Sequence, residues 1–412
     1  MSVRLAVRGQ TATWSLLERL AWRVGLAAAR RISVGHLTIV LPDGERLTFG
    51  PADAELRGEI QLHDPAALTR ILLHGETGAG EAYVDGLWSS PDLEALLRMA
   101  ARERSSLDLS AGWFRVPGQV GRTVAHRLRR NTRANSRRNI AAHYDLGNDF
   151  YRVFLDETLT YSSAVFEHPG QSLADAQRNK YRLVAEGAGL RAGYHVLEIG
   201  TGWGGFALYA AGELGCRVTT ITISHEQYAL ARQRVAEAGL EHLVDVQLRD
   251  YRDISGTYDA IVSIEMLEAV GAEYFATFFE TCDRALVPGG RLSVQVITFP
   301  DAAYERQRRG ANWIQTYIFP GGLCPSLAVL EAATHDTRLL IRSVRDIADH
   351  YARTLHAWRT RFMGRLEDVR AQGFDERFIR MWEYYLALSE AGFATGLSQD
   401  LQIVFEKRRG LA

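Results

Sequence analysis

Short apolar runs alternate with stretches of helical spacing through the second half of the chain. From Tyr181 onward, the apolar runs lie at residues 194–199, 217–223, 245–248, 260–264 and 291–297. Repeated units of this spacing are typical of parallel strands with helices packed between them. The pattern predicts an α/β domain built on a Rossmann-like, doubly wound sheet, and after Arg345 it predicts helices with apolar, aromatic-rich faces.

A different pattern occupies the first hundred residues. Short strand-like runs at 36–41 and 59–62 lie on either side of the turn signal at 42–44, and leucines recur with helical spacing between 68 and 99. We expect a small α+β domain, whose leucine stripes form ordinary core or line a lipid groove. The chain is predicted to divide into a small domain at 1–120, a linker at 121–138 and a larger domain at 139–412.

The composition is that of a globular, intracellular protein. Of 412 residues, 47% are hydrophobic, and the formal net charge of −1 gives no general attraction to nucleic acid. Cys216, Cys282 and Cys324 are far apart and form no CxxC pair, so we expect a cytoplasmic, reducing compartment with neither disulfide nor metal. Charged residues interrupt the apolar stretch at 16–29, which argues against a signal peptide or spanning helix. Any membrane association is expected to be peripheral, at the inner face.

Arginine is concentrated in the predicted linker. Seven arginines fall between Arg122 and Arg138, with no acidic residue among them. Near a membrane, each basic residue attracts anionic headgroups by about 1 kcal/mol, and the same charges attract nucleic-acid phosphates. Because no aromatic residues alternate with these arginines, nucleic acid is disfavoured as a partner. The segment is expected to contact an anionic membrane surface, or to serve as a solvated connector.

A glycine-rich turn follows the first apolar run of the larger domain. Gly200, Gly202 and Gly204 lie where this run ends and where a helix over 206–215 is predicted to begin. Glycines permit a tight turn and a close approach of the backbone to a bound nucleotide. The turn alone does not identify the nucleotide, because dinucleotide-binding enzymes use a related pattern. Trp203, inside the turn, is expected to pack against the sheet.

Residues around the turn favour S-adenosylmethionine as the ligand. Glu198 stands two residues before the first glycine, where a carboxylate attracts the cationic methionyl moiety and gains nothing from a pyrophosphate. Thr222 and Gln227 follow the next strand, where a dinucleotide site usually presents an acidic residue to the ribose. Asp250, after the third strand, is placed to accept a hydrogen bond from an adenine amino group.

Longer motifs carry a resemblance to a known family. They are NIAAHYDLGNDF at 139–150, TYSSA at 160–164, DYRD at 250–253, EMLEAVG at 265–271, YIFPGG at 317–322 and, in the small domain, GEAYVDGLW at 80–88. On these segments the chain resembles, over nearly its whole length, the cyclopropane fatty acid synthase family, relatives of the mycolic acid cyclopropane synthases. The resemblance implies cofactor contacts from Tyr161, Ser162 and Tyr251, a homodimer, and a small domain that helps to engage lipid.

The reaction implied by this resemblance adds a carbon from S-adenosylmethionine to the cis double bond of an unsaturated acyl chain in a membrane phospholipid. An alkene is a weak nucleophile, and its attack on the sulfonium methyl leaves a carbocation that water would capture. Ring closure then requires a base against the added methyl group. In the resembled family the base is bound bicarbonate, whose ligands map here onto the side chains of Glu268 and Tyr317 and the backbone amides of Ser163 and Ile297.

Three positions depart from the family pattern. Ser163 stands where many members have cysteine and Ala269 where a histidine follows the glutamate, and both changes should be tolerated. Gln295 replaces the histidine that holds the anion; its amide can donate a hydrogen bond to bicarbonate but cannot share a proton or carry charge. The product is therefore expected to be a cyclopropane or, after a hydride shift, an exocyclic methylene group that would need a reductase partner.

Two other classes of protein are retained as alternatives. A methyltransferase of another small-molecule or nucleic-acid acceptor would share the fold and the cofactor, but the motif at 139–150 argues against it. A non-catalytic lipid-binding protein is favoured only by the missing histidine, and the presence of Glu268 and Tyr317 argues against it. His143 is expected either to line the cofactor entrance or to be a satisfied polar residue at a helix end.

Overall fold

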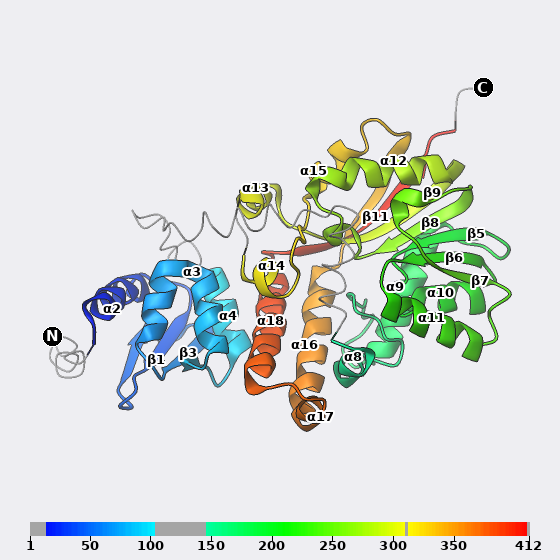
Figure 1. The fold of residues 1–412 in the computed structure, drawn as a ribbon. Helices are drawn as coiled ribbons and strands as arrows, with labels where there is room; N and C mark the ends of the chain where they lie inside the picture. Colours follow the sequence, from blue (N-terminus) through cyan, green and yellow to red (C-terminus); the bar gives the residue numbers. More distant parts are fainter. Residues whose placement is uncertain (1–13, 104–145, 310–311, 410–412) are drawn as a thin grey trace. The chain divides into compact units, whose positions relative to one another are not determined.

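The computed structural model describes residues 14–103, 146–309 and 312–409, which fall into two compact units (Figure 1). Within this described chain, one unit contains residues 14–103 and 366–395, and the other contains residues 146–365 and 396–409. The arginine-rich linker and His143 lie outside the described residues. In the part of the chain that is described, no helix combines the length and the hydropathy needed to cross a membrane.

The smaller unit has an α+β fold, as its sequence pattern predicts. Its sheet has the order β2-β1-β3-β4, in which β1 is antiparallel to β2 and parallel to β3, and β3 is antiparallel to β4. The strands are β1 (His36–Val40), β2 (Arg46–Phe49), β3 (Arg57–Leu62) and β4 (Trp88–Ser89), and the helices are α2 (Leu16–Ala29), α3 (Ala66–Val84), α4 (Leu93–Arg102), α17 (Leu366–Ala371) and α18 (Glu376–Ala394). A capping box between Ser15 and Glu18 sets the start of α2.

Helices α17 and α18 belong to this smaller unit. The domain boundaries predicted from the sequence, in contrast, place all of 139–412 in the larger domain. α18 packs on α3 and α4 and buries Trp382. The Tyr83 hydroxyl donates to the Glu383 carboxylate at 2.7 Å, and Arg380 donates to the Tyr83 carbonyl oxygen at 2.6 Å. A helix distant in sequence thus completes the core of the small unit, which a local pattern of apolar residues does not reveal.

The larger unit is built on a seven-stranded sheet with the order β10-β11-β9-β8-β5-β6-β7. Its strands are β5 (His195–Ile199), β6 (Arg217–Thr222), β7 (Val244–Leu248), β8 (Tyr258–Ile264), β9 (Leu286–Thr298), β10 (Leu339–Asp346) and β11 (Gln399–Lys407). The five neighbouring strands β9, β8, β5, β6 and β7 are parallel, which confirms the predicted doubly wound sheet. β11 is antiparallel to both of its neighbours.

The prediction of helices throughout the tail is wrong at β11. Leu401, Ile403 and Phe405 alternate along this segment and are all buried in one apolar cluster of the sheet. An alternation of apolar residues with a period of two is the signature of a strand. The strand inserts between β9 and β10, where it brings Asp400 and Gln402 beside Gln295 of β9.

Helices cover both faces of this sheet (Figure 1). α9 (Leu173–Ala188), α10 (Gly205–Gly212) and α11 (His225–Glu237) contribute to the apolar cluster on one face, and α12 (Phe275–Ala285) and α15 (Leu327–Ala333) contribute to the cluster on the other. The unit also contains α8 (Asn148–Phe154), α13 (Asp301–Arg309), α14 (Trp313–Tyr317) and α16 (Ala348–Gly364), with the short 3₁₀ turns η2 (Tyr251–Asp253), η3 (Leu267–Ala269) and η4 (Ala272–Tyr274). Burial on both faces explains why the parallel strands are continuous apolar runs.

The strand order reverses at β5. β6 pairs with one side of β5 and β8 with the other, so that α10 and α12, the helices that follow β5 and β8, lie on opposite faces. In open α/β sheets, ligands bind outside the carboxyl ends of the strands at such a switch point. The edge next to β5 is therefore the part of the fold in which a functional site is expected.

Candidate active site

The turn after β5 is formed by glycines in backbone conformations that other residues rarely adopt. Gly200, Gly202 and Gly204 have φ angles of 102°, 52° and 86°. A Cβ atom at Gly200 would lie 3.2 Å from the Cβ of Met266, so the turn passes close to the segment that follows β8. A side chain at Gly200 would therefore both strain the backbone and crowd the switch point. The turn brings main chain to this edge, as the binding of a nucleotide requires.

Glu198, predicted to favour a cationic ligand, is buried near the end of β5. It is 2% exposed, and its Oε2 accepts a hydrogen bond from the Thr220 hydroxyl at 2.5 Å. Burial raises the pKa of Glu198 to about 8, although the Thr220 hydrogen bond and the Lys180 ammonium lower it. A cation bound at this edge would favour the carboxylate form. Glu198 is thus suited to recognise a sulfonium ion.

The other predicted cofactor residues of the parallel strands lie at the same edge. Thr222 ends β6, and its hydroxyl donates to Gln227 Oε1 at 2.8 Å. Asp250 follows β7 and accepts hydrogen bonds from Arg252 Nε at 2.8 Å and Nη2 at 2.6 Å. The pairing with Arg252 keeps Asp250 oriented as an acceptor. Carboxyl ends of adjacent parallel strands share one edge, so the fold brings these residues together, while their contacts with a cofactor stay predictions.

Tyr161, Ser162 and Tyr251 are held in place by packing and by one buried cation. The Tyr161 ring stacks on Trp358 with centroids 5.2 Å apart, and the Tyr251 ring lies edge-on to a phenylalanine of α12. The Ser162 hydroxyl accepts a hydrogen bond from Lys180 Nζ at 2.6 Å. Lys180 is fully buried on α9, and burial lowers its pKa to about 8. No sequence motif identified this lysine as a candidate site residue.

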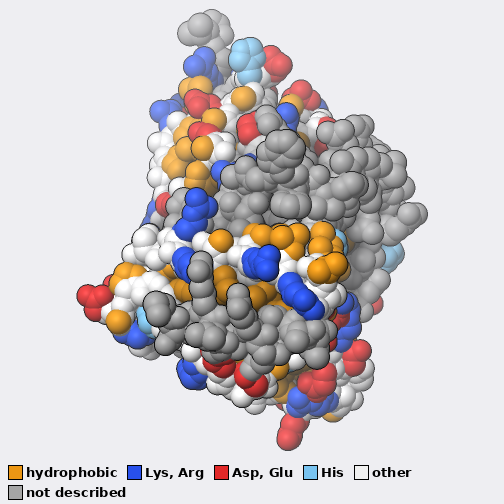
Figure 2. Space-filling model, turned by 90° about the vertical axis from the view of Figure 1, so that its left-hand side faces the viewer, with side chains coloured by type: hydrophobic (Ala, Val, Ile, Leu, Met, Phe, Trp, Pro, Cys, Tyr) orange, Lys and Arg blue, Asp and Glu red, His pale blue; other side chains and the backbone are white. Residues whose placement is uncertain are grey.

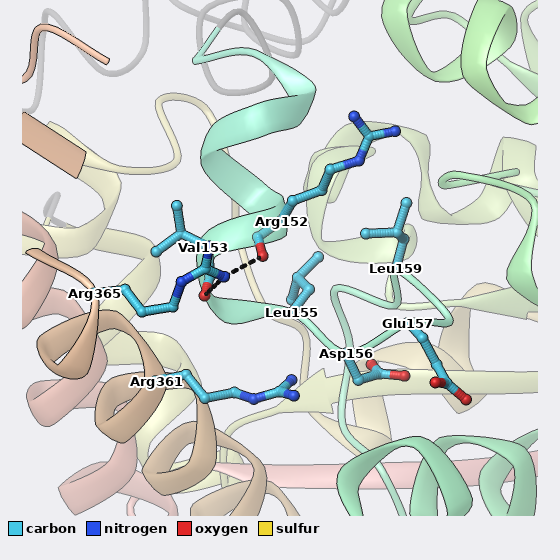
Figure 3. Close-up of a pocket in the computed structure, with 8 residues that line it drawn as sticks. All are labelled: Arg152, Val153, Leu155, Asp156, Glu157, Leu159, Arg361 and Arg365. Atoms are coloured by element: carbon cyan, nitrogen blue, oxygen red, sulfur yellow. Dashed lines mark hydrogen bonds between the residues drawn. The ribbon is translucent and has the colours of Figure 1, made fainter. Parts of the chain in front are cut away.

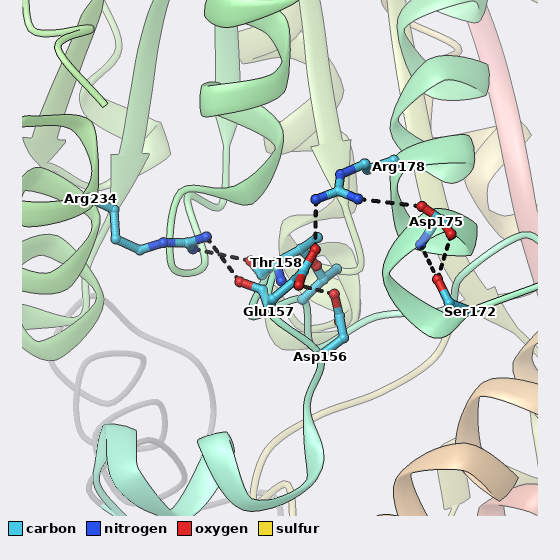
Figure 4. Close-up of polar contacts among 8 residues, drawn as sticks. Asp156, Glu157, Thr158, Ser172, Asp175, Arg178 and Arg234 are labelled. Carbon is cyan, nitrogen blue, oxygen red and sulfur yellow. Dashed lines mark hydrogen bonds and ion pairs between the residues drawn. The ribbon is translucent and has the colours of Figure 1, made fainter. Parts of the chain in front are cut away.

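The segment that leads into Ser162 and Ser163 is anchored by two arginines (Figure 4). Arg234 of α11 donates to the Thr158 carbonyl oxygen at 3.1 Å and to the Trp203 carbonyl oxygen at 2.6 Å. Arg178 of α9 bridges the carboxylates of Glu157 and Asp175, at 2.7 Å and 3.4 Å. Trp203 was expected to pack against the sheet, and its side chain is buried. Arg234 therefore ties the glycine turn to the segment before Ser163.

Glu268, predicted to be the anion-holding glutamate, is half-buried beside the end of β9. Its Oε1 accepts a hydrogen bond from the Ile297 backbone amide at 2.5 Å, while its Oε2 is buried and has no hydrogen-bond partner in the described part of the chain. Burial, and then the charge of Glu265, raises the pKa of Glu268 to about 8. An unpartnered buried carboxylate oxygen is costly to maintain, which marks Glu268 as a residue held for chemistry.

Gln295, the residue in place of the expected histidine, is fully buried on β9 between two carboxylates. Its Nε2 donates to Glu265 Oε1 at 2.8 Å and to Asp400 Oδ2 at 3.2 Å. Its Oε1 accepts a hydrogen bond from Gln402 Nε2 at 3.1 Å. We refer to Glu265, Glu268, Gln295 and Asp400 as the carboxylate cluster. Burial raises the pKa of Asp400 well above its usual range, and the charges of Glu265 and Glu268 raise it further.

Glu265 is a site residue for which the sequence suggested no role, although it opens the motif at 265–271. Its Oε1 accepts a hydrogen bond from the Ser163 backbone amide at 2.8 Å, and its Oε2 accepts one from the Tyr351 hydroxyl at 2.7 Å. The Ser163 and Ile297 amides, both predicted to hold bicarbonate, thus donate to carboxylates of the chain itself. The donor set present here therefore does not fit a bound bicarbonate.

Tyr317, predicted to be an anion ligand, lies at the end of a short helix near the cluster. It ends α14 with 39% of its surface exposed, and its ring centroid lies 5.5 Å from that of Trp313. The loop after α14 does reach the cluster, because the Leu323 amide donates to the Glu268 carbonyl oxygen at 2.9 Å. The structure thus brings the loop that follows Tyr317 to Glu268, and the role of the Tyr317 hydroxyl stays a prediction.

A separate cavity of about 440 Å³ lies between α8 and the end of α16 (Figure 3). It is lined by Arg152, Val153, Leu155, Asp156, Glu157, Leu159, Arg361 and Arg365. The Arg365 guanidinium donates to the carbonyl oxygens of Arg152 and Val153, at 3.2 Å and 3.1 Å. The cavity contains none of the residues predicted from the sequence, but it adjoins the segment that leads to Ser163.

Comparison with known proteins yields one family model and close relatives. The model described as mycolic acid cyclopropane synthetase matches residues 131–403. The chain is 43% identical to a tuberculostearic acid methyltransferase of Mycobacterium tuberculosis, covering 89% of this chain and 87% of that protein. It is 32% identical to a cyclopropane-fatty-acyl-phospholipid synthase of Escherichia coli, covering 85% of this chain and 88% of that protein. A crystal structure of a mycolic acid cyclopropane synthase complexed with SAH and CTAB matches with a TM-score of 0.62 and 29% identity, covering 66% of this chain and 98% of that one.

Proposed function

This chain belongs to the cyclopropane synthase family of S-adenosylmethionine-dependent methyltransferases, which act on fatty acyl lipids, and from that premise we propose its substrate and product. The proposed substrate is the cis double bond of an unsaturated acyl chain in a membrane phospholipid. The proposed product is the cyclopropane. The observation that carries this proposal is the carboxylate cluster near the glycine turn, in which Gln295 and Asp400 are fully buried and Glu265 and Glu268 are half-buried.

The chemistry of the cluster suits a carbocation. The alkene π electrons attack the methyl carbon of S-adenosylmethionine, the carbon–sulfur bond breaks with its electrons passing to sulfur, and a cation remains on the acyl chain. Loss of a proton from the added methyl group then closes the ring with the C–H electrons. Gln295 and Asp400 are fully buried, so the cluster offers carboxylate bases in a site from which water is excluded. Methylation of an amine or a hydroxyl group would not need this seclusion.

A second product is favoured by a specific residue. Gln295 lacks the titratable ring of the histidine expected at its position, and the chain is 43% identical to a tuberculostearic acid methyltransferase. If a hydride shifts along the acyl chain before the proton leaves, the same cation yields an exocyclic methylene group. A reductase partner would then convert the methylene lipid into a methyl-branched one. Both products share the first step, so the fate of the cation decides between them.

Peripheral contact with the membrane is part of the proposal. Helix α2 carries three exposed leucines, Leu16, Leu17 and Leu20, which are 85%, 42% and 42% exposed. The face drawn in Figure 2 has hydrophobic side chains gathered among Lys and Arg side chains. Apolar side chains flanked by basic ones favour the interface of an anionic membrane. We propose that the protein acts at the inner face of the membrane. The arginine-rich linker, which lies outside the described residues, is predicted to contact the anionic surface, and the protein is predicted to be a homodimer.

The test uses purified protein, S-adenosylmethionine and vesicles of an anionic dioleoyl phospholipid. Mass spectrometry of the released acyl chains should show the gain of one CH₂ unit, and gas chromatography should identify a cyclopropane. A methylene product would favour the second candidate. Unchanged acyl chains would overturn both, and methylation of an added amine or phenol instead would indicate a methyltransferase with another acceptor.

A further inference from the structure

The Glu265 carboxylate occupies the hydrogen-bond donors that were expected to hold an external base. Its Oε1 accepts from the Ser163 amide at 2.8 Å and from Gln295 Nε2 at 2.8 Å, and its Oε2 accepts from the Tyr351 hydroxyl at 2.7 Å. We infer that Glu265 is the base that removes the proton from the added methyl group, in place of bound bicarbonate. This inference rests on the proposed function.

A carboxylate and a bicarbonate ion offer donors the same chemistry. Each is a planar anion with two or more oxygens that accept hydrogen bonds. A backbone N–H carries a single proton, so the Ser163 amide that donates to Glu265 is not available to a second anion of this kind. The Ile297 amide is likewise directed at Glu268 Oε1, at 2.5 Å. An external bicarbonate would have to displace the carboxylates of Glu265 and Glu268 from these donors.

The position of Glu265 in the fold matches that role. It directly follows β8, the strand that pairs with β5 at the switch point, and the next residue is the Met266 that faces Gly200. The carboxylate therefore belongs to a segment that lies close to the glycine turn, where the methyl donor is predicted to bind.

The backbone at Glu265 is strained in a way that a merely structural residue would not require. Its φ of 48° lies in the left-handed region, which costs a non-glycine residue roughly 1–2 kcal/mol. Strained residues of this kind cluster at functional sites, where their surroundings hold them in place. Three hydrogen bonds from Ser163, Gln295 and Tyr351 hold this one. Glycine would adopt the same conformation without strain, so the side chain is retained for what it does.

Charged neighbours allow Glu265 to cycle between its two protonation states. Burial raises the pKa of Glu265, while the buried Lys180 ammonium, the Tyr351 hydroxyl and the Ser163 amide lower it. Gln295 bridges Glu265 and Asp400, so that the two acids respond to each other's charge. In the proposed step the carboxylate accepts the proton, the C–H electrons form the third ring bond, and Glu265 becomes the neutral acid.

The experiment measures turnover on dioleoyl phospholipid vesicles in buffers freed of carbon dioxide and in buffers with added bicarbonate. The wild-type protein should turn over at the same rate, within about two-fold, in both. Glu265→Gln should lower kcat by roughly 100-fold or more, the scale of a lost general base, while its Kd for S-adenosylmethionine stays within about two-fold of wild type. Glu265→Gly should be inactive without bicarbonate and should regain turnover when bicarbonate is added, because its removal frees the Ser163 and Gln295 donors.

Each failure has its own signature. A wild-type protein that needs bicarbonate, or a Glu265→Gln variant with undiminished kcat, overturns the assignment of Glu265. A Glu265→Gly variant that folds, as judged by its melting temperature and cofactor binding, but is not rescued by bicarbonate also counts against it. A wild-type protein that adds no carbon under either condition overturns the proposed function instead.

Discussion

Two regions meet at the carboxyl edge of the larger unit's sheet, and they are built in opposite ways. The glycine turn after β5 is made of backbone, with Gly200, Gly202 and Gly204 in conformations that side chains disfavour. The carboxylate cluster beyond it is made of side chains, of which Gln295 and Asp400 are fully buried and Glu265 and Glu268 are half-buried. The first region excludes side chains so that a ligand can approach, and the second concentrates charged side chains where water is excluded.

The difference separates binding from chemistry. Changes to the turn should weaken the binding of S-adenosylmethionine, because they obstruct the approach of the nucleotide to the backbone. Changes to the cluster should slow turnover with little effect on binding, because its groups act on the proton and the cation. Variants in each region can therefore be compared by the same two measurements, Kd for S-adenosylmethionine and kcat.

The largest effect is expected at the turn. Gly200→Val places a branched side chain against Met266 at a φ of 102°, so we expect the affinity for S-adenosylmethionine to fall by on the order of 1,000-fold, or about 4 kcal/mol. Gly193→Val is the matched control, since it has a φ of 81° but open space around its Cβ position. Isothermal titration calorimetry distinguishes the two. Equal losses in both variants would mean that backbone strain alone, and not obstruction of the site, causes the effect.

In the carboxylate cluster, Glu268→Gln is expected to lower kcat by roughly 100-fold and to leave the Kd for S-adenosylmethionine within about two-fold of wild type. The amide cannot ionise, and it replaces a carboxyl group whose Oε2 is buried and has no hydrogen-bond partner in the described part of the chain. Glu273→Gln, an exposed change on η4, is the control and should alter neither constant. If Glu268→Gln weakens binding as much as turnover, the separation between the two regions is wrong.

Glu198 lies beside the turn but is a buried acid, so it tests whether charge also matters for binding. Burial raises its pKa to about 8, and the protonated acid gives no charge to attract a sulfonium ion. As pH rises from about 6 to about 8, the carboxylate forms and the affinity should increase about ten-fold, because the bound cation favours the ionised state. Glu198→Gln cannot ionise, and its affinity should not change over this range. Titrations at several pH values compare the two proteins, and a flat wild-type curve would remove Glu198 from cofactor recognition.

The turn and the parallel sheet could be predicted because their signals are local. Gly200 to Gly204 follow one apolar run, and each parallel strand is itself a continuous run. β11 was missed although Leu401, Ile403 and Phe405 alternate as a strand requires, because the surrounding tail is helical. The place of α18 in the smaller unit could not be predicted, since its partners α3 and α4 lie some three hundred residues earlier.

The carboxylate cluster could be predicted only in part because its contacts join distant segments. Resemblance to a family supplied Glu268, Gln295 and the two backbone amides, whereas Glu265 stood in a quoted motif without an assigned role. Its partners Ser163 and Tyr351 are separated from it by 102 and 86 residues. No sequence spacing predicts which of two nearby glutamates an amide will meet. The positive φ of Glu265 is likewise a property that only the three-dimensional structure reveals.

The smallest effect is expected at Arg234, which links the two regions. Its guanidinium donates to the Trp203 carbonyl oxygen in the turn and to the Thr158 carbonyl oxygen in the segment before Ser163. Arg234→Met keeps much of the side-chain volume but removes these two hydrogen bonds, each worth about 1 kcal/mol net, together with a longer one to the Glu157 carbonyl oxygen at 3.5 Å. Because one side chain supports both regions, Kd should rise and kcat should fall together, each by roughly three- to five-fold. Arg232→Met, an exposed change on the same helix, should alter neither constant. A change in kcat alone would show that the turn keeps its shape without Arg234 and that the two regions are supported independently.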